Sequence, residues 1–168
     1  MKVAITDACI FIELHHLLLT SVFFKLDIEI HTTVDVFNEL YPEQQELLKA
    51  FEAGGKLYLH LLSQEDRAAI KEKKYTGGLS ENDKTVLYIA GRIGAMVLSS
   101  DKPVRKQAKK NEIEFHGMFW IFDCLVEQNL IPKILAIEKL KKLVSMNILY
   151  QNSLELNKEV EQRFERWK

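Results

Sequence analysis

The sequence has 168 residues, of which 47% are hydrophobic, and this is enough for a single domain with a packed core rather than a disordered chain. Lys and Arg number 23 against 24 Asp and Glu, so the net charge of -1 gives no overall attraction to nucleic acid. A nucleic-acid partner would therefore need a local basic patch. The two cysteines, Cys9 and Cys124, form no disulfide or zinc spacing, which predicts free thiols in a reducing compartment.

The N-terminal segment has neither the long apolar region nor the small-residue cleavage site of a signal peptide. No apolar run reaches the roughly 20 residues that are needed to cross a bilayer. These observations predict a cytoplasmic protein without a membrane partner.

The first half of the chain alternates predicted strands and helices. Residues 3–6 form a short apolar strand, and Asp7 then caps a helix from 8 to about 19. Residues 27–32 alternate polar and apolar side chains, which predicts a half-exposed strand nearer the sheet edge. Thr32 or Thr33 caps the helix that follows, and Pro42 kinks or divides this helix before the turn at Gly54 and Gly55.

The second half continues this alternation and ends in helices. Residues 56–62 predict a third strand and residues 63–74 a short polar helix, whereas Ser80 to Asp83 fit a capping box before the next helix. Residues 94–98 form an apolar run typical of a strand buried on both faces. A basic helix to residue 110, a strand at 112–115 and helices from 118 to 168, interrupted at Pro132 and at 147–152, complete the prediction.

Strands that alternate with helices in this way predict an α/β fold of three layers, α/β/α, around a parallel sheet of about five strands. We predict one domain over residues 1–130 and a helical C-terminal extension over 131–168, packed on the same domain.

Four acids are predicted to meet at one edge of this sheet. In right-handed βαβ crossovers each helix starts at the carboxyl edge of the sheet, where ligands bind in open α/β sheets. Asp7 and Asp101 follow strands, Asp83 lies in the first turn of a helix, and Glu39 lies about two turns into another helix. Crowded carboxylates repel and raise one another's pKa values, and a divalent cation removes this conflict.

Carboxylate oxygens favour Mg²⁺ or Mn²⁺, and no Cys/His set for zinc is present. Two such ions can activate a water and stabilise the leaving oxygen in phosphodiester hydrolysis. Ser80, Ser99 and Ser100 are candidates to bind metal-bound waters or to orient the acids. Each acid taken alone also has a simpler explanation, as a helix cap or a solvated helix residue.

The four acidic segments, taken together, resemble the PIN-domain ribonucleases. Residues 3–7 resemble the opening strand with its first acid, and residues 33–40 the helix with the second acid. Residues 79–83, followed by Leu87 and Ala90, resemble the helix with the third acid, and residues 97–101 the Thr-x-Asp element, with Ser in place of Thr. The order and spacing match over about residues 1–130.

This resemblance implies a Mg²⁺- or Mn²⁺-dependent endoribonuclease whose metal-binding acids are Asp7, Glu39, Asp83 and Asp101. It also implies that the chain is the toxin of a toxin-antitoxin pair, that it forms a homodimer, and that a cognate antitoxin protein is its partner. One departure is Cys9, which stands where the family often has Ser, Thr or Asn, and a thiol is the poorer hydrogen-bond partner. The helical segment after about residue 131 is a candidate for partner binding or dimerisation.

A basic helix face beside the fourth acid is the candidate RNA-binding surface. Spacings of three and four place Lys102, Arg105 or Lys106, and Lys109 on one face, where they can neutralise RNA phosphates. An ordinary solvated helix face is the alternative interpretation. Asp123, on a later helix, is a possible further member of the acid cluster.

The sequence lacks the residues that other classes of phosphate-binding or phosphate-transferring protein require. A haloacid dehalogenase needs a second Asp where Cys9 stands, a receiver domain needs an adjacent acid pair, and no glycine pattern matches a P-loop or a Rossmann fingerprint. The remaining alternative is a PIN-like domain that binds nucleic acid or protein with little or no catalysis.

Overall fold

The computed structural model describes residues 1–168, and its internal contacts divide the chain into two compact units. The first unit contains residues 1–12 and 27–118, and the second contains residues 13–26 and 119–168. The division into residues 1–130 and 131–168 remains a prediction.

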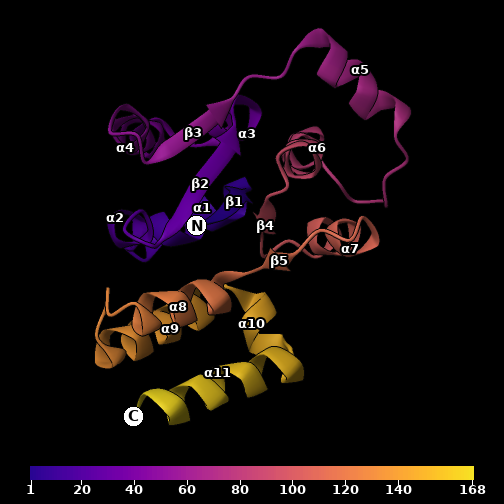
Figure 1. Ribbon diagram of the computed structural model, residues 1–168. Helices are drawn as coiled ribbons and strands as arrows, with labels where there is room; N and C mark the ends of the chain where they lie inside the picture. The colour runs from indigo at the N-terminus through magenta and orange to yellow at the C-terminus, as the bar shows by residue number, and fades with distance from the viewer. The chain divides into compact units, whose positions relative to one another are not determined.

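The first unit contains a five-stranded sheet with the order β3-β2-β1-β4-β5, in which every pair of neighbours is parallel (Figure 1). The strands are β1 (Lys2–Thr6), β2 (Ile28–Thr33), β3 (Leu57–His60), β4 (Met96–Leu98) and β5 (Phe115–His116). Strand β4 is wholly apolar and all three of its residues are buried, as expected of a strand whose two faces are both covered. This confirms the predicted α/β fold with a parallel sheet flanked by helices.

The helices of the first unit begin where the capping residues of the sequence predict. They are α1 (Ala8–His16, which continues into the second unit), α3 (Val34–Glu39), α4 (Pro42–Ala53), α5 (Gln64–Glu72), α6 (Glu81–Ile93) and α7 (Lys102–Lys110). The side chains of Thr33, Ser63 and Ser80 accept hydrogen bonds from the first turns of α3, α5 and α6. Pro42 starts α4 and so separates it from α3, as predicted.

Helix α6 connects the sheet to the candidate site, because it packs against β1, β2 and β4. Its inner side chains, such as Val86 and Ile89, are fully buried, and its polar first turn carries Asp83. The helix ends at Gly94, whose φ of 66° lies in the left-handed region that favours glycine.

Two glycine substitutions in this region are expected to change stability in opposite directions. Gly94→Ala should lower the free energy of unfolding by about 1 kcal/mol, because alanine at positive φ is strained although no atom lies near its Cβ. Gly91→Ala should raise it by roughly 0.5 to 1 kcal/mol, because Gly91 lies within α6 and its added Cβ also meets open space. Urea unfolding of both variants measures the difference, and equal signs would contradict this account of the helix end.

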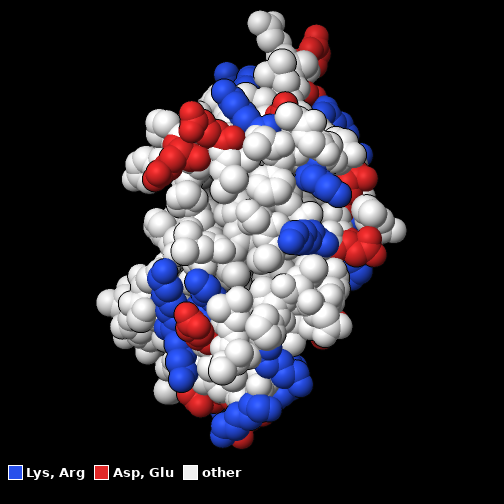
Figure 2. Space-filling view, turned by 90° about the vertical axis from the view of Figure 1, so that its left-hand side faces the viewer, with Lys and Arg blue, Asp and Glu red and all other residues white.

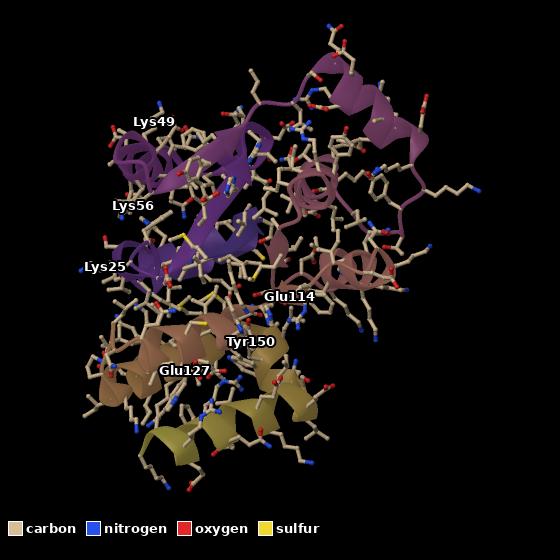
Figure 3. The ribbon with its side chains drawn as sticks, viewed as in Figure 1. Lys25, Lys49, Lys56, Glu114, Glu127 and Tyr150 are labelled. Carbon is tan, nitrogen blue, oxygen red and sulfur yellow. The ribbon has the colours of Figure 1, made fainter.

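The second unit is helical, with α2 (Thr20–Phe23), most of α8 (Met118–Glu127), α9 (Lys133–Met146), α10 (Ile148–Asn152) and α11 (Leu154–Trp167). The ring of Phe119 lies 5.4 Å from that of Tyr150, which Figure 3 labels on α10. Phe122 is fully buried near Trp167, with 6.4 Å between the ring centroids. Aromatic packing therefore connects α8 with α10 and α11.

Several predicted element boundaries were wrong. The first helix ends at His16 rather than near residue 19, because Leu18 has a φ of 57° that no helix accommodates. The last strand is Phe115–His116 rather than 112–115, and residues 148–152, predicted as a break, form α10. None of the helices is long and apolar enough to span a membrane.

Candidate functional site

Asp7 lies at the carboxyl end of β1, where its backbone N–H donates to the Leu98 carbonyl of β4 over 3.2 Å. Only 2% of the residue is exposed. Its Oδ1 accepts hydrogen bonds from the Cys9 thiol at 2.9 Å and from the Ile10 backbone N–H at 3.3 Å. Its Oδ2 accepts from the Ser99 hydroxyl. The structure thus uses Cys9 as a hydrogen-bond donor to the first acid.

Ser99 and Cys9 also hold the turn that carries the fourth acid. The Ser99 hydroxyl accepts from the Asp101 backbone N–H at 3.0 Å, and the Cys9 sulfur accepts from the Ser100 backbone N–H at 3.4 Å. Asp101 is the N-cap residue of α7, yet its side chain makes no capping hydrogen bond. A capping role therefore does not explain the carboxylate of Asp101.

Asp83 takes part in the predicted capping box at the start of α6. Its N–H donates to the Ser80 hydroxyl at 3.1 Å, and its Oδ2 accepts from the Ser80 N–H at 3.1 Å. This fixes the orientation of the carboxylate at the start of the helix. Ser80 thus contacts the Asp83 carboxylate, and the role of both residues in a metal site stays a prediction.

Glu39 is the exposed last residue of α3, and it is connected to the first turn of α6. Asn82 Nδ2 donates to Glu39 Oε2 over 2.8 Å. A second link joins Thr33, the N-cap residue of α3, to Thr85 of α6 through a 2.9 Å hydrogen bond between their hydroxyls. We did not predict either link, because nothing in the sequence pairs these positions.

Two of the candidate acids, Asp7 and Asp101, have raised pKa values, and the causes include the charge of a third, Asp83. Burial raises the pKa of Asp7 from its ordinary 3.8 to about 6, against the opposing effect of the hydrogen bonds from Cys9, Ser99 and Ile10, and the Asp83 charge raises it further. Burial and the Asp83 charge also raise the pKa of Asp101. The negative charge of Asp83 therefore acts on both other aspartates.

No Lys or Arg side chain forms an ion pair with Asp7, Glu39, Asp83 or Asp101, whereas other acids of the chain have such partners. Asp66 pairs with Arg92 at 2.8 Å within the first unit. Asp123, considered above as a further cluster member, instead pairs with Arg163 at 2.8 Å and with Arg166 at 2.7 Å within the second unit. Its carboxylate is thus already neutralised by two guanidinium groups.

The chemistry of the four acids fits a hard divalent cation, because all the candidate ligands are carboxylates and they lack a protein counter-charge. As placed here, however, no three His, Cys, Asp or Glu side chains are arranged so that they could hold a metal ion. The oxygens of Asp7, Asp83 and Glu39 are engaged in the hydrogen bonds described above. Joint coordination would require changes of side-chain conformation.

Helix α7 presents the predicted basic face next to Asp101. Lys102, Lys106 and Lys109 are exposed. Arg105 is only half-exposed, because its guanidinium lies over the Phe115 ring at 5.2 Å and close to Gly117. The lysines are therefore the more accessible cations. On the face shown in Figure 2, positive and negative side chains are interspersed, in keeping with the balanced net charge.

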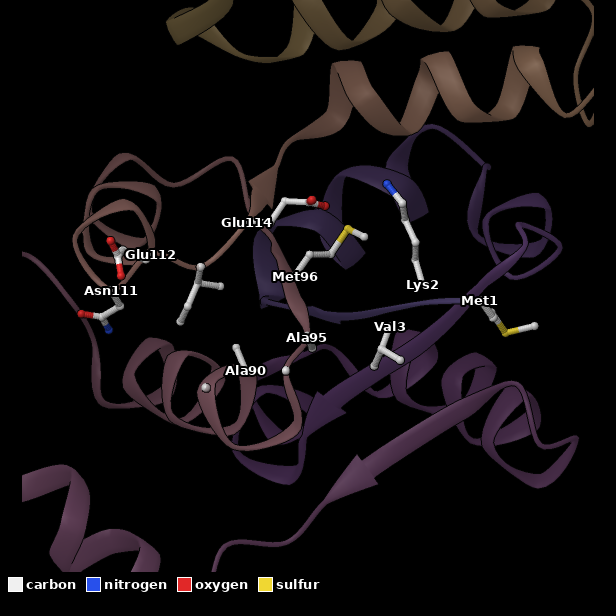
Figure 4. Close-up of a pocket in the computed structure, with 12 residues that line it drawn as sticks. Met1, Lys2, Val3, Ala90, Ala95, Met96, Asn111, Glu112 and Glu114 are labelled. Atoms are coloured by element: carbon white, nitrogen blue, oxygen red, sulfur yellow. The ribbon is translucent and has the colours of Figure 1, made fainter.

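A cavity of about 590 Å³ lies at the opposite, amino edge of the sheet, where β1 and β4 begin (Figure 4). Its lining residues are Met1, Lys2, Val3, Ala90, Gly91, Gly94, Ala95, Met96, Asn111, Glu112, Ile113 and Glu114. None of the four candidate acids contributes to it, so the cavity is not part of the candidate site.

The fold and the site together define an α/β protein with an acidic site at the carboxyl edge of a parallel sheet. The sequence matches the family described as "DUF3368: PIN domain" over residues 3–159, and the chain therefore belongs to the PIN domain family. Members of this family are commonly nucleases and typically bind Mg²⁺.

Among solved structures, a similar one is that of a PilT N-terminus domain protein from the hyperthermophilic archaeon Sulfolobus solfataricus. The TM-score is 0.48 and the sequence identity 13%, and the match covers 71% of this chain and 90% of that one. No match was found among curated proteins.

Proposed function

We propose that this chain is a Mg²⁺- or Mn²⁺-dependent endoribonuclease that hydrolyses RNA phosphodiester bonds, with Asp7, Glu39, Asp83 and Asp101 as the metal-binding residues. The observation that carries this proposal is the lack of a protein counter-charge: no Lys or Arg pairs with any of the four acids, although Asp7 is buried and this burial is the main cause that raises its pKa. An unneutralised acid cluster destabilises a fold, so its presence favours a role in binding a cation.

In this proposal, residues beside the acids hold the carboxylates in position. Cys9, Ile10 and Ser99 orient the carboxylate of Asp7, whereas Asn82 holds Glu39 beside the first turn of α6. A bound divalent cation would lower the pKa of a water and neutralise the charge that develops on the phosphate.

The exposed lysines of α7 are the proposed contacts for RNA phosphates next to the acids. Lys102 directly follows Asp101, and Lys106 and Lys109 continue the exposed face away from it. Phosphate contacts of this kind give affinity without sequence preference and weaken as salt is added. Arg105 is expected to contribute less, because its guanidinium packs on Phe115.

A second candidate function is a PIN-like nucleic-acid or protein binding module with weak or absent catalysis. The observation that favours it is the arrangement of the acids, of which no three are placed to hold an ion. Metal binding separates the two candidates, because only the nuclease requires it.

Titration with Mn²⁺ is therefore the experiment that tests the proposal. At a free concentration about 100 times the Kd, a ligand that binds only the folded state adds about 2.7 kcal/mol of stability, which corresponds to a rise of roughly 5 to 10 °C in Tm. We expect this rise in the wild type and its loss in Asp7→Asn and Asp101→Asn. Differential scanning fluorimetry measures it, with Ca²⁺ and Mg²⁺ compared in parallel.

A matched control is Glu112→Gln, because Glu112 is an exposed acid at the amino edge of the sheet, beside the cavity. This variant should keep the full response to Mn²⁺. An unchanged Tm for the wild type at saturating Mn²⁺ and Mg²⁺ would reject the metal assignment and favour the binding module.

The toxin role, the homodimer and the cognate antitoxin stay predictions based on the family resemblance. Light scattering coupled to size-exclusion chromatography measures the oligomeric state. A small DNA-binding protein encoded immediately upstream would support an antitoxin.

A further inference from the structure

Two histidines on neighbouring strands face each other with their ring nitrogens. Nδ1 of His31, on β2, lies 2.8 Å from Nε2 of His60, on β3, and the ring centroids are 5.0 Å apart. The rings therefore meet edge to edge, with these two nitrogens between them. Strand β3 is the outer strand of the sheet and lies beside β2 in Figure 1. Two imidazole nitrogens in this arrangement can share either a proton or a metal ion.

The register of the two strands explains why these side chains meet. His31 is paired with Tyr58, and His60 lies two residues further along β3. Paired residues, and residues two apart along a strand, point to the same face of a sheet, so Glu29 of β2 shares this face. The two histidines are 29 positions apart in the chain, and for this reason the sequence shows no metal-binding spacing.

Glu29 determines which nitrogen of His31 carries the proton. Its Oε1 lies 2.7 Å from His31 Nε2. A carboxylate only accepts hydrogen bonds, so Nε2 is the donor, and Nδ1, which faces His60, is left without a proton. A histidine that binds a metal through one nitrogen almost always donates its other ring N–H to a carboxylate, a carbonyl or a water. The contact with Glu29 therefore prepares His31 Nδ1 as a metal ligand.

The surroundings of His60 favour the neutral ring that metal binding requires. Burial, followed by the charges of His31 and Arg92, lowers the pKa of His60, so this ring carries no charge at neutral pH. Arg92 is itself paired with Asp66 at 2.8 Å, which balances its positive charge.

The cluster borders solvent, from which an ion and its water ligands can enter. The side chain of Glu29 is 37% exposed, and Tyr58, whose ring stacks on His31 with 4.8 Å between the centroids, is 46% exposed. A zinc ion that is bonded tetrahedrally to two imidazoles holds their nitrogens about 3.3 Å apart, given Zn–N bonds of about 2.0 to 2.1 Å. The two nitrogens, now 2.8 Å apart, need to separate by only about half an ångström.

We propose that His31 Nδ1 and His60 Nε2 bind one Zn²⁺ ion, with Glu29 orienting His31 and water completing the coordination. Imidazole suits zinc, copper and nickel, whereas Mg²⁺ and Ca²⁺ prefer oxygen ligands. On binding, the proton of His60 Nε2 is exchanged through solvent to His60 Nδ1, and both rings stay neutral. The ion would join the outer strand β3 to β2. This site has two protein ligands, neither of which forms a hydrogen bond with any of the four acids.

Isothermal titration of the full chain with ZnCl₂ at pH 7.5 tests this proposal, with saturating Mg²⁺ present to occupy the proposed acidic site. We expect one Zn²⁺ to bind to the wild type at the histidines. His60→Ala and His31→Gln should each weaken this binding by at least about 10-fold, because loss even of a group that only orients a ligand has an effect of about 10- to 100-fold. Glu29→Gln should weaken it by about 10-fold, because it removes the carboxylate that orients His31.

His116→Ala is the matched control. His116 is a histidine at the other edge of the sheet, with Glu114 at 3.2 Å, and no other histidine lies on β5 or β4. This variant should bind Zn²⁺ as the wild type does. Equal affinity in the wild type and His60→Ala would overturn the proposal, as would an equal loss in His116→Ala. A loss in Asp101→Asn that the histidine variants do not show would place the zinc at the acids instead.

Nuclear magnetic resonance of the histidine rings tests the same proposal without a substitution, so a variant that fails to fold does not leave it open. Long-range ¹H–¹⁵N spectra should show the Nε2–H form of His31 before zinc is added. Zn²⁺ should then shift the signals of His31 Nδ1 and His60 Nε2 and leave those of His116 unchanged. An Nδ1–H form of His31, or zinc-dependent shifts at other histidines only, would contradict the assignment.

Discussion

Asp101→Asn is expected to reduce RNA cleavage by at least about 100-fold, the size typical of losing one group that acts on the reacting atoms. Asp101 is the candidate acid whose side chain has no capping hydrogen bond, so the substitution removes charge without breaking a helix cap. Burial and Asp83 already raise its pKa, so loss of this charge should not destabilise the fold. The measurement is the initial rate of cleavage of structured and single-stranded RNA in Mn²⁺ and in Mg²⁺.

Two comparisons make this result interpretable. Glu112→Gln removes an acid at the opposite edge of the sheet and should cleave at the wild-type rate. The wild type in EDTA should be as inactive as Asp101→Asn in Mn²⁺. Equal cleavage by the wild type and Asp101→Asn would contradict the catalytic assignment, and metal-independent cleavage would point to another kind of nuclease.

The parallel sheet could be predicted from the sequence, and so could the position of each acid within its strand end or helix. Buried strands leave uninterrupted apolar runs, as in residues 96–98, and polar caps such as Ser80 mark where helices start. Given right-handed crossovers, these local signals are enough to place Asp7 and Asp101 at one edge. Short strands at the sheet edge carry a weaker signal, which is why the two-residue β5 was misplaced.

Long-range side-chain pairs could not be predicted in this way. The link between Asn82 and Glu39 joins residues 43 positions apart, and the pairing of Asp123 with Arg163 joins helices of the C-terminal segment. Such pairs depend on how helices rotate when they pack, which periodicity alone does not determine. Cys9 is a local case: a thiol is a poorer hydrogen-bond partner than a hydroxyl, and in the fold this thiol is one of the donors to Asp7 Oδ1.

Asp7→Asn is expected to stabilise the metal-free protein at neutral pH, by an amount on the order of 2 to 3 kcal/mol. The reason is the pKa of Asp7, which burial raises from 3.8 in its ordinary state to about 6 in the folded protein. The folded state therefore binds a proton more tightly than the unfolded state, and stability decreases as the pH rises from about 4 to about 6. Above this window the charged carboxylate destabilises the fold, and asparagine removes that cost.

Urea unfolding in EDTA at several pH values measures the effect. Near pH 4 the free energy of unfolding of Asp7→Asn should equal that of the wild type. Above about pH 6 it should exceed the wild-type value by the full amount, so the stability of the variant should depend less on pH. Asp83→Asn is the comparison, because the Asp83 charge is the smallest of the causes acting on Asp7, so its effect through Asp7 should be small. A wild-type protein whose stability rises through pH 4 to 6, with Asp7→Asn less stable at pH 7, would show that Asp7 is stabilised as a carboxylate.

The same substitution should have the opposite effect once Mn²⁺ is present. The wild type gains the stability of metal binding, whereas Asp7→Asn loses a ligand and gains little or nothing. Removal of one buried charge would thus stabilise the metal-free fold and weaken the metal-bound one. That reversal of sign between EDTA and Mn²⁺ is not expected of a residue that only caps α1, because a cap contributes equally with and without the ion.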